Sequence, residues 1–263
     1  MRPNILKILP AAVPILLAAS LLIFHCRHTE KAALRRIEGG GIVLTFDDDF
    51  VSEWIEADRI LKKYNWKATF FVCHFKSLNT EAIRRLDSLQ SRGHEIGFHS
   101  ENHHNAVAFI DSQSVDAYLA VEILPSLAAL SENGFHPVSF AYPEGARNKR
   151  LDRVLLAYFD MLRGITYKRR IQQKRDYYAN GSRLVFGMGL DAVSGNKPEY
   201  ILSILQYAKD HDKIAVFFGH SIARSAGTLD YATTYETLER ICRFVQDNGM
   251  HFLTMKELIH NNP

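Results

Sequence analysis

Short apolar segments alternate with segments of helical periodicity along most of this chain. About eight apolar segments have the length and the β-branched or aromatic content of buried strands, at residues 41–46, 67–73, 94–98, 137–142, 161–166, 183–190, 213–219 and 251–255. Helical spacing lies between them, at residues 54–64, 80–92, 114–131, 150–159, 198–209 and 235–246. Continuous apolar strands that alternate with helices predict a parallel sheet covered by helices.

The number of strands and the size of the region narrow the choice of architecture. About eight parallel strands within roughly 220 residues favour a barrel over an open sheet. The strands are short and uneven in length. We therefore expect an α/β fold with a distorted or incomplete (β/α) barrel of about seven to eight parallel strands.

An uncharged apolar run at residues 8–24 precedes the alternating pattern and follows Arg2 and Lys7. The run reaches the lower end of the length of about 17–25 residues that crosses a bilayer. We expect one N-terminal hydrophobic helix that acts as an uncleaved signal anchor, with a cleaved signal peptide as the alternative. The chain then divides into an anchor or signal peptide at 1–27, a linker at 28–40 and one domain at 41–263.

Charge and cysteine content exclude some classes of protein. The net charge of +3 is too small to indicate a nucleic-acid-binding protein, so we expect no nucleic-acid partner. The three cysteines, Cys26, Cys73 and Cys242, show no CxxC spacing. The last two lie in apolar patterns and are interpreted as core residues without a disulfide. His94, which precedes a predicted strand, is expected to face water.

Three consecutive carboxylates, Asp47, Asp48 and Asp49, end the first predicted strand. Like charges at close range raise one another's pKa and cost free energy. A chain tolerates this arrangement when the residues form a solvated acidic turn, or when a cation lies among them. Taken alone, the three aspartates leave both interpretations open.

Other titratable residues stand at the C-terminal ends of later strands, the edge that carries the chemistry in parallel barrels. His99 and His103 are spaced i, i+4 and project from one side if the chain turns helical there. Two imidazoles and one carboxylate form a common catalytic zinc set that leaves a position for water. A divalent cation would also relieve the repulsion among the aspartates. The pattern predicts a metal site, with His104 as an alternative ligand in a shifted register.

Three segments resemble the polysaccharide deacetylase family, also called carbohydrate esterase family four: "TFDD" (45–48), "HSENH" (99–103) and a late apolar strand that ends at His220. "KATFFV" and "GHEIGFHS" are similar to that family as well. The resemblance runs from about Gly41 to Ile259. It implies a metal-dependent hydrolase, acting on carbon–nitrogen bonds other than peptide bonds, that removes N-acetyl groups from an N-acetylated polysaccharide.

Peptidoglycan, chitin-like chains and exopolysaccharide are all compatible with this resemblance. Two alternatives are an O-acetyl esterase on the same scaffold and a non-catalytic carbohydrate-binding relic of the fold. A substrate in the cell envelope leads us to expect a domain outside the cytoplasmic membrane, held by the N-terminal segment or secreted. The expected partners are thus the polysaccharide and, through that segment, the membrane.

The resemblance also implies roles for individual residues. Asp48, His99 and His103 would bind one divalent metal ion, with zinc expected. Asp47 would act as the general base that takes a proton from the attacking water.

Further roles fall on later strand ends. His220 would protonate the leaving amine, and Asp191 is the expected group that orients it. The loop after the fourth strand, Tyr142, Pro143 and Glu144, would contact the substrate, with the backbone N–H of Glu144 on the oxyanion.

The sequence departs from the family pattern at this same loop. Ala141 and Glu144 stand where the family usually has an arginine and a tyrosine. That arginine normally pairs with the catalytic aspartate, which is Asp47 here. Arg163 or Arg147 could replace it, and the sequence does not choose between them. The family's aspartate–tryptophan motif is not recognisable, and "GLDAV" is its closest substitute.

Overall fold

The computed structural model describes residues 37–166, 177–228 and 230–260. The chain divides into a unit at 1–32, which lies outside the described residues, and a unit at 33–263, which carries every element below. The predicted N-terminal hydrophobic helix and the anchor or signal peptide also lie outside the described residues. Among the residues that are described, no helix has the length and apolar character needed to cross a bilayer.

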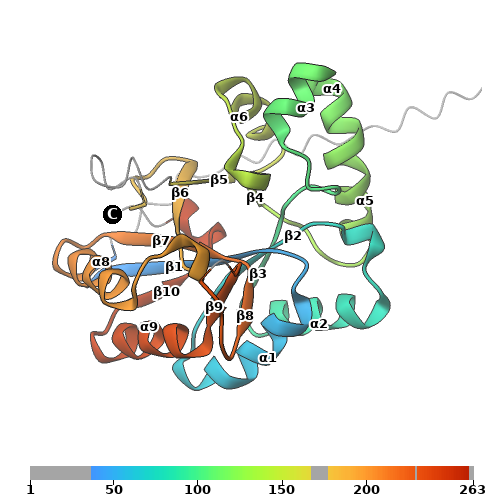
Figure 1. Cartoon of the computed structure of the whole chain (residues 1–263). Coiled ribbons are helices and arrows are strands. Elements are labelled where there is room, and N and C mark those ends of the chain that lie inside the picture. Colours follow the sequence, from blue (N-terminus) through green and yellow to red (C-terminus); the bar gives the residue numbers. More distant parts are fainter. Residues whose placement is uncertain (1–36, 167–176, 229, 261–263) are drawn as a thin grey trace, which may run out of the picture. The chain divides into compact units, whose positions relative to one another are not determined.

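Seven parallel strands form a closed barrel (Figure 1). In sheet order they are β1 (Gly41–Asp48), β2 (Thr69–Val72), β3 (Glu95–Phe98), β4 (Ser139–Ala141), β5 (Met161–Ile165), β6 (Leu184–Gly189) and β7 (Ile214–Gly219). A parallel pairing between β1 and β7, from Gly41 with Ile214 to Phe46 with Gly219, closes the ring. The predicted parallel barrel is confirmed.

An eighth strand, β10 (His251–Leu253), shares one edge of β1 with β2. β10 pairs with the first residues of β1, Gly41 to Val43, whereas β2 pairs with the last, Thr45 to Asp48. The barrel is therefore closed by different strands at its two ends, which is the irregularity that the uneven strand lengths predicted.

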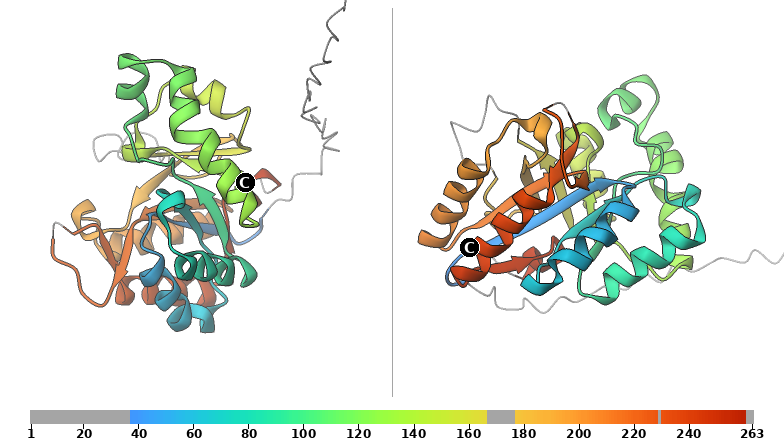
Figure 2. Two further views of the ribbon diagram at one scale, coloured as in Figure 1. Left: turned by 90° about the vertical axis from the view of Figure 1, so that its right-hand side faces the viewer. Right: turned by 60° about the horizontal axis from the view of Figure 1, so that its bottom comes forward.

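Helices surround the strands. They are α1 (Val51–Leu61), α2 (Thr80–Ser91), α3 (Ala106–Ser112), α4 (Val115–Tyr118), α5 (Leu124–Glu132), α6 (Lys149–Leu155), α8 (Pro198–Asp210) and α9 (Tyr235–Asp247). Figure 2 shows α8, α9, α1 and α2 on the outside of the strands around β1, and each of these helices contacts the next. Several begin at an Asn, Ser or Thr whose side-chain oxygen accepts the N–H three residues on, as Asn79 does from Ala82 and Asn148 from Leu151.

Successive residues of the strands face two different apolar cores. Along β1, Ile42, Leu44 and Phe46 pack between sheet and helices, whereas Val43 belongs to a smaller cluster that fills the barrel. Because side chains alternate along a strand, Thr45 and Asp47 share the inward direction of Val43. The charged end of β1 thus directs Asp47 toward the barrel axis.

Some elements were not expected from the sequence. β8 (Ser221–Ala223) and β9 (Ala232–Thr234) form a small parallel pair beyond β7. α3 follows the loop at residues 99–105, which contains His99, His103 and His104 and is called the histidine-rich loop below. The predicted helix at 114–131 is interrupted by a π-helical segment, Leu119–Ile123, between α4 and α5. Short 3-10 turns lie at Lys62–Tyr64, Phe75–Ser77, Pro143–Gly145, Ala192–Ser194 and Lys256–Ile259.

The expectation that His94 faces water is wrong. Its side chain is 1% exposed, its Nδ1 accepts the Ala68 N–H at 3.1 Å, and its Nε2–H donates to Asp58 at 3.0 Å. His94 joins α1 to the beginnings of β2 and β3, which requires a buried polar group at that position. Cys73 and Cys242 are buried and free, as predicted, and Cys26 lies outside the described residues.

Candidate active site

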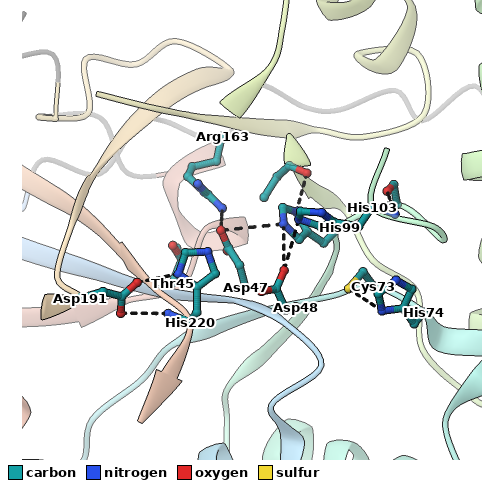
Figure 3. A network of polar contacts seen from close by, with 12 residues as sticks. Thr45, Asp47, Asp48, Cys73, His74, His99, His103, Arg163, Asp191 and His220 are labelled. Carbon is teal, nitrogen blue, oxygen red and sulfur yellow. Dashed lines mark hydrogen bonds and ion pairs between the residues drawn. The ribbon is translucent and has the colours of Figure 1, made fainter. Parts of the chain in front are cut away.

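A cavity of about 460 Å³ opens at the C-terminal ends of the strands. Its walls come from β1, β5 and β7 and from the loops that follow β3, β4, β6 and β8. The lining residues are Asp47, Asp48, His99, His103, Glu144, Gly145, Ile165, Asp191, Val193, Ser194, Phe218, His220 and Tyr231. The titratable residues singled out at separate strand ends therefore meet in one place (Figure 3).

Strained backbone is concentrated around this cavity. Asp48, Ser100, His103 and Glu144 are not glycines, yet their φ angles are 81°, 64°, 56° and 56°. Such conformations cost about 1–3 kcal/mol each and persist only where surrounding contacts impose them. Their occurrence on three loops that border one cavity marks it as a functional site.

Asp48, His99 and His103 form a compact set of metal-ligand atoms. Asp48 Oδ1 lies 3.6 Å from His99 Nε2 and 3.3 Å from His103 Nε2, and all three atoms lie within 4.8 Å of one another. Asp48 Oδ1 is buried, and none of the described residues donates a hydrogen bond to it. A buried carboxylate oxygen without a donor, facing two imidazole nitrogens, fits a bound divalent cation.

The orientation and protonation of His99 also suit a ligand. Its Nδ1–H donates to the backbone oxygen of Ala141 at 2.9 Å, which leaves the Nε2 lone pair directed at Asp48. Burial, assisted by the positive charge of Arg163, lowers the pKa of His99 to about 3. The imidazole is therefore neutral at physiological pH and able to coordinate a metal.

Asp47 is paired with a buried guanidinium. Arg163 donates from Nη2 to Asp47 Oδ2, is fully buried, and lies between the rings of Phe71 and Phe218, 5.4 and 5.1 Å from their centres. Burial acts to raise the pKa of Asp47, but the charge and the hydrogen bond of Arg163 and the nearby imidazoles of His99 and His220 together outweigh it and hold that pKa below its ordinary value. Asp47 is thus an ionised carboxylate inside the barrel.

The structure selects between the two arginines that the sequence left open. Arg147 binds Asp152, through Nε at 2.9 Å and through Nη2, and does not reach Asp47. Arg163 reaches Asp47 because it lies on the inward face of β5, in register with Ala141 on the neighbouring strand β4.

The structure brings His220 and Asp191 into contact. The imidazole Nδ1–H donates to Asp191 Oδ2 at 2.6 Å, and the other carboxylate oxygen accepts from Thr233 Oγ1 at 2.8 Å. Burial acts to lower the pKa of His220, but the hydrogen bond to Asp191 and the nearby carboxylates raise it above the ordinary value. His220 therefore retains its proton more strongly than a free histidine.

The loop after β4 reaches the cavity with only one of its three predicted contact residues. Glu144 lines the cavity and accepts a hydrogen bond from Asn105 Nδ2 at 2.7 Å. Tyr142 is fully buried and donates to Asp152 at 2.9 Å, and neither Tyr142 nor Pro143 lines the cavity.

The neighbours of the ligand set lie outside it. His104 donates from Nδ1 to Glu122 at 2.6 Å, so that among the described residues the ligand group contains His103 rather than His104. Asp49 turns outward and lies 3.4 Å from His74. Sequence reasoning missed Glu122, and its signal was a lone carboxylate within the apolar pattern of a helix.

Comparisons with known proteins agree with this geometry. Residues 36–158 match the family described as polysaccharide deacetylase. A search of curated proteins gives no match. Among solved structures, the Bc1960 peptidoglycan N-acetylglucosamine deacetylase is 17% identical with a TM-score of 0.57, covering 87% of this chain and 91% of that one.

Two further structures share the fold. The peptidoglycan deacetylase PdaC from Bacillus subtilis is 19% identical, with a TM-score of 0.53 and coverage of 83% of this chain and 89% of its own. A family 4 carbohydrate esterase from Streptomyces lividans is 16% identical, with a TM-score of 0.52 and coverage of 81% and 91%. Residues 36–158 thus resemble the polysaccharide deacetylase family, and the barrel has the fold of these solved structures.

Proposed function

We propose that this protein is a metal-dependent deacetylase that removes N-acetyl groups from an N-acetylated polysaccharide. The observation that carries the proposal is the convergence of the ligand set Asp48, His99 and His103 with Asp47 and His220 on one cavity. Two of the similar structures are described as peptidoglycan deacetylases, which supports an N-acetylated glycan as the substrate class.

Asp48, His99 and His103 would hold the metal ion, with zinc as the first candidate because two imidazoles and one carboxylate suit it. When bound, the ion supplies Lewis-acid polarisation of a water molecule and of the acetamide carbonyl. Two features favour this assignment: His99 is neutral, and Asp48 Oδ1 receives no hydrogen bond from any residue that the structure describes.

Asp47 is the proposed general base. Arg163 holds it ionised, and its Oδ1 receives no hydrogen bond from the described residues, so this oxygen is available to accept a proton. It would take that proton from the water as the water oxygen attacks the acetamide carbon. The non-catalytic alternative relied on the missing family arginine, and Arg163 removes that argument.

His220 is the proposed general acid. Asp191 fixes its Nδ1, so the proton available for transfer is on Nε2. When the carbon–nitrogen bond breaks, this proton goes to the leaving nitrogen, and acetate and a free amine result. The backbone N–H of Glu144 is proposed to stabilise the negative oxygen of the tetrahedral intermediate.

We propose that the domain acts outside the cytoplasmic membrane, because an N-acetylated polysaccharide such as peptidoglycan lies in the cell envelope. Residues 1–27 would then anchor the protein or direct its export. Labelling of intact cells with a membrane-impermeant reagent at an introduced surface cysteine tests this placement. Labelling only after lysis would contradict it.

The reaction is tested by measuring acetate release from N-acetylglucosamine oligomers and from peptidoglycan. The purified protein is assayed as isolated, after chelator treatment, and after zinc is restored. We expect release that the chelator abolishes and zinc restores, with Asp48→Asn failing to recover. Release from O-acetylated substrates alone would favour the esterase alternative, and chelator-resistant release would contradict the metal-dependent mechanism.

A further inference from the structure

The π-helical segment Leu119–Ile123 places a carboxylate inside the protein. Glu122 has no exposed surface, although its neighbours Val121 and Leu124 are among the most exposed large apolar residues described. Wide π turns often occur at functional sites because the extra residue redirects side chains. Here the redirected side chain is Glu122, which points at the histidine-rich loop.

Glu122 accepts hydrogen bonds from residues on both sides of the ligand His103. Oε2 accepts the backbone N–H of Asn102 at 2.9 Å, and Oε1 accepts Asn102 Nδ2 at 2.9 Å and His104 Nδ1 at 2.6 Å. The backbone oxygen of Glu122 accepts the N–H of Glu101 at 3.0 Å. One residue therefore fixes three of the loop residues that surround His103.

The loop needs such support because its backbone is strained. Ser100 and His103 are both in the left-handed region, with φ of 64° and 56°, and His103 N–H donates to Ser100 Oγ at 3.2 Å. Each residue costs about 1–3 kcal/mol in this conformation. Hydrogen bonds to a buried carboxylate are stronger than neutral ones and can offset that cost. Without them the loop would relax, and His103 Nε2 would leave its position 3.3 Å from Asp48.

We propose that Glu122 is a positioning residue of the metal site, which holds the loop 100–104 in the conformation that directs His103 at Asp48. This inference rests on the proposed function in one respect, namely that Asp48, His99 and His103 bind a metal. It predicts that loss of the Glu122 carboxylate lowers the affinity for zinc, beyond any decrease in the stability of the metal-free protein.

A second buried carboxylate provides the matched control. Asp58 also accepts hydrogen bonds from a histidine, an arginine and a tryptophan, at the opposite end of the barrel. Asp58→Asn should lower stability without touching the loop 100–104. Glu132→Gln, an exposed residue of α5, controls for a change of charge on the same helical stretch.

The test compares zinc affinity, the absorption spectrum of bound Co²⁺ and the apo melting temperature of the full chain. We expect Glu122→Gln to raise the zinc Kd by about 10–100-fold and to alter the Co²⁺ spectrum, as loss of outer-sphere support typically does. Asp58→Asn and Glu132→Gln should leave the zinc Kd within about twofold. If Glu122→Gln does not fold, Asn102→Ala and His104→Ala, which each remove one exposed donor, should still weaken binding severalfold.

Two results would overturn the inference, and they are distinguishable. An unchanged zinc Kd and Co²⁺ spectrum in Glu122→Gln, or in both loop variants, would overturn the role of Glu122 alone. Absence of zinc binding in the unmodified protein would overturn the proposed metal site and this inference with it.

Discussion

Asp58 and Asp47 are buried aspartates at opposite ends of the barrel, and each pairs with an arginine. They differ in how many of their carboxylate oxygens accept hydrogen bonds. At the end where the strands begin, Asp58 accepts from Trp66 and His94 on one oxygen and from Arg92 on the other. At the end where the strands finish, Asp47 accepts from Arg163 on one oxygen only. Its Oδ1, with Nε and Nη1 of the arginine, has no hydrogen-bond partner among the described residues.

The difference is the one expected between a structural ion pair and the proposed catalytic one. A buried polar group that lacks a partner costs about 1–3 kcal/mol, so a fold does not retain several of them without a reason. The complete network around Asp58 joins α1 to the barrel and stabilises it. The incomplete network around Asp47 leaves a proton acceptor at the cavity. Four changes test this contrast, and the largest expected effect comes first.

Replacing Asp47 by Asn removes the proposed base while keeping its shape. We expect turnover to fall about a thousandfold, since a positioned general base contributes about 10²–10⁴-fold, with zinc still bound. Acetate release and metal content measure the two quantities, with folding checked by circular dichroism. Asp49→Asn, at the adjacent but outward-facing carboxylate, is the control and should retain activity. If Asp47→Asn retains more than a tenth of the normal turnover, Asp47 is not the general base.

Replacing Arg163 by Met leaves Asp47 buried without its partner charge. Breaking a buried ion pair from one side costs about 3–5 kcal/mol, and we expect a loss of that order in urea unfolding together with reduced turnover. Arg147→Met breaks a pair that is partly exposed and should cost less, about 1 kcal/mol, and leave turnover intact. Equal effects of the two substitutions would show that Arg163 has no special relation to the site.

Replacing Asp58 by Asn should affect stability and its pH dependence, but not turnover by the folded protein. Burial opposes ionisation, yet the hydrogen bonds from His94 and Arg92 lower the pKa of Asp58 from 3.8 to about 2. Because this pKa lies below the unfolded value, the stabilisation is present above pH 4 and is lost as the pH falls toward 2. The shift corresponds to about 2 kcal/mol. Urea unfolding between pH 2 and pH 7 should show a shallower acid loss in the variant, and an unchanged profile would contradict the assignment.

Replacing Asp191 by Asn should alter the pH dependence of turnover more than its maximum. Asp191 raises the pKa of His220, and a general acid acts only in its protonated form. The basic limb of the pH–rate profile should therefore move to lower pH, with roughly a tenfold loss at neutral pH, which is about 1.4 kcal/mol. Asp230→Asn, at an exposed loop position, serves as the control. A basic limb at unchanged pH would show that titration of His220 does not produce that limb.

Much of the fold could be predicted because it depends on local patterns. The expected strands differ from the observed ones by only a few residues at either end, and the ligand set comes together because β1 and β3 end at the same edge. Alternation along the strands also distinguishes the two arginines. Arg163 follows Met161 at the inward spacing, and Asp47 follows Val43, which would have favoured Arg163 over Arg147.

Other features depend on contacts that no local pattern shows. The burial of His94 results from α1, which brings Asp58 to it across 36 residues. The π turn at Leu119–Ile123 brings Glu122 to Asn102 and His104, whereas the helical pattern of 114–131 predicts a regular helix. The β8–β9 pair, three residues in each strand, is too short for a periodic signal.

The shared edge of β1 has a consequence for biosynthesis. The first half of this strand pairs on one side with β7 and on the other with β10, about 170 and 210 residues later in the chain. Contacts of such long range form slowly, and an unpaired strand edge attracts other chains. A chain emerging from the ribosome therefore exposes the beginning of β1 until nearly all of the barrel has been synthesised, and a product that stops before His251 would keep that edge open to aggregation.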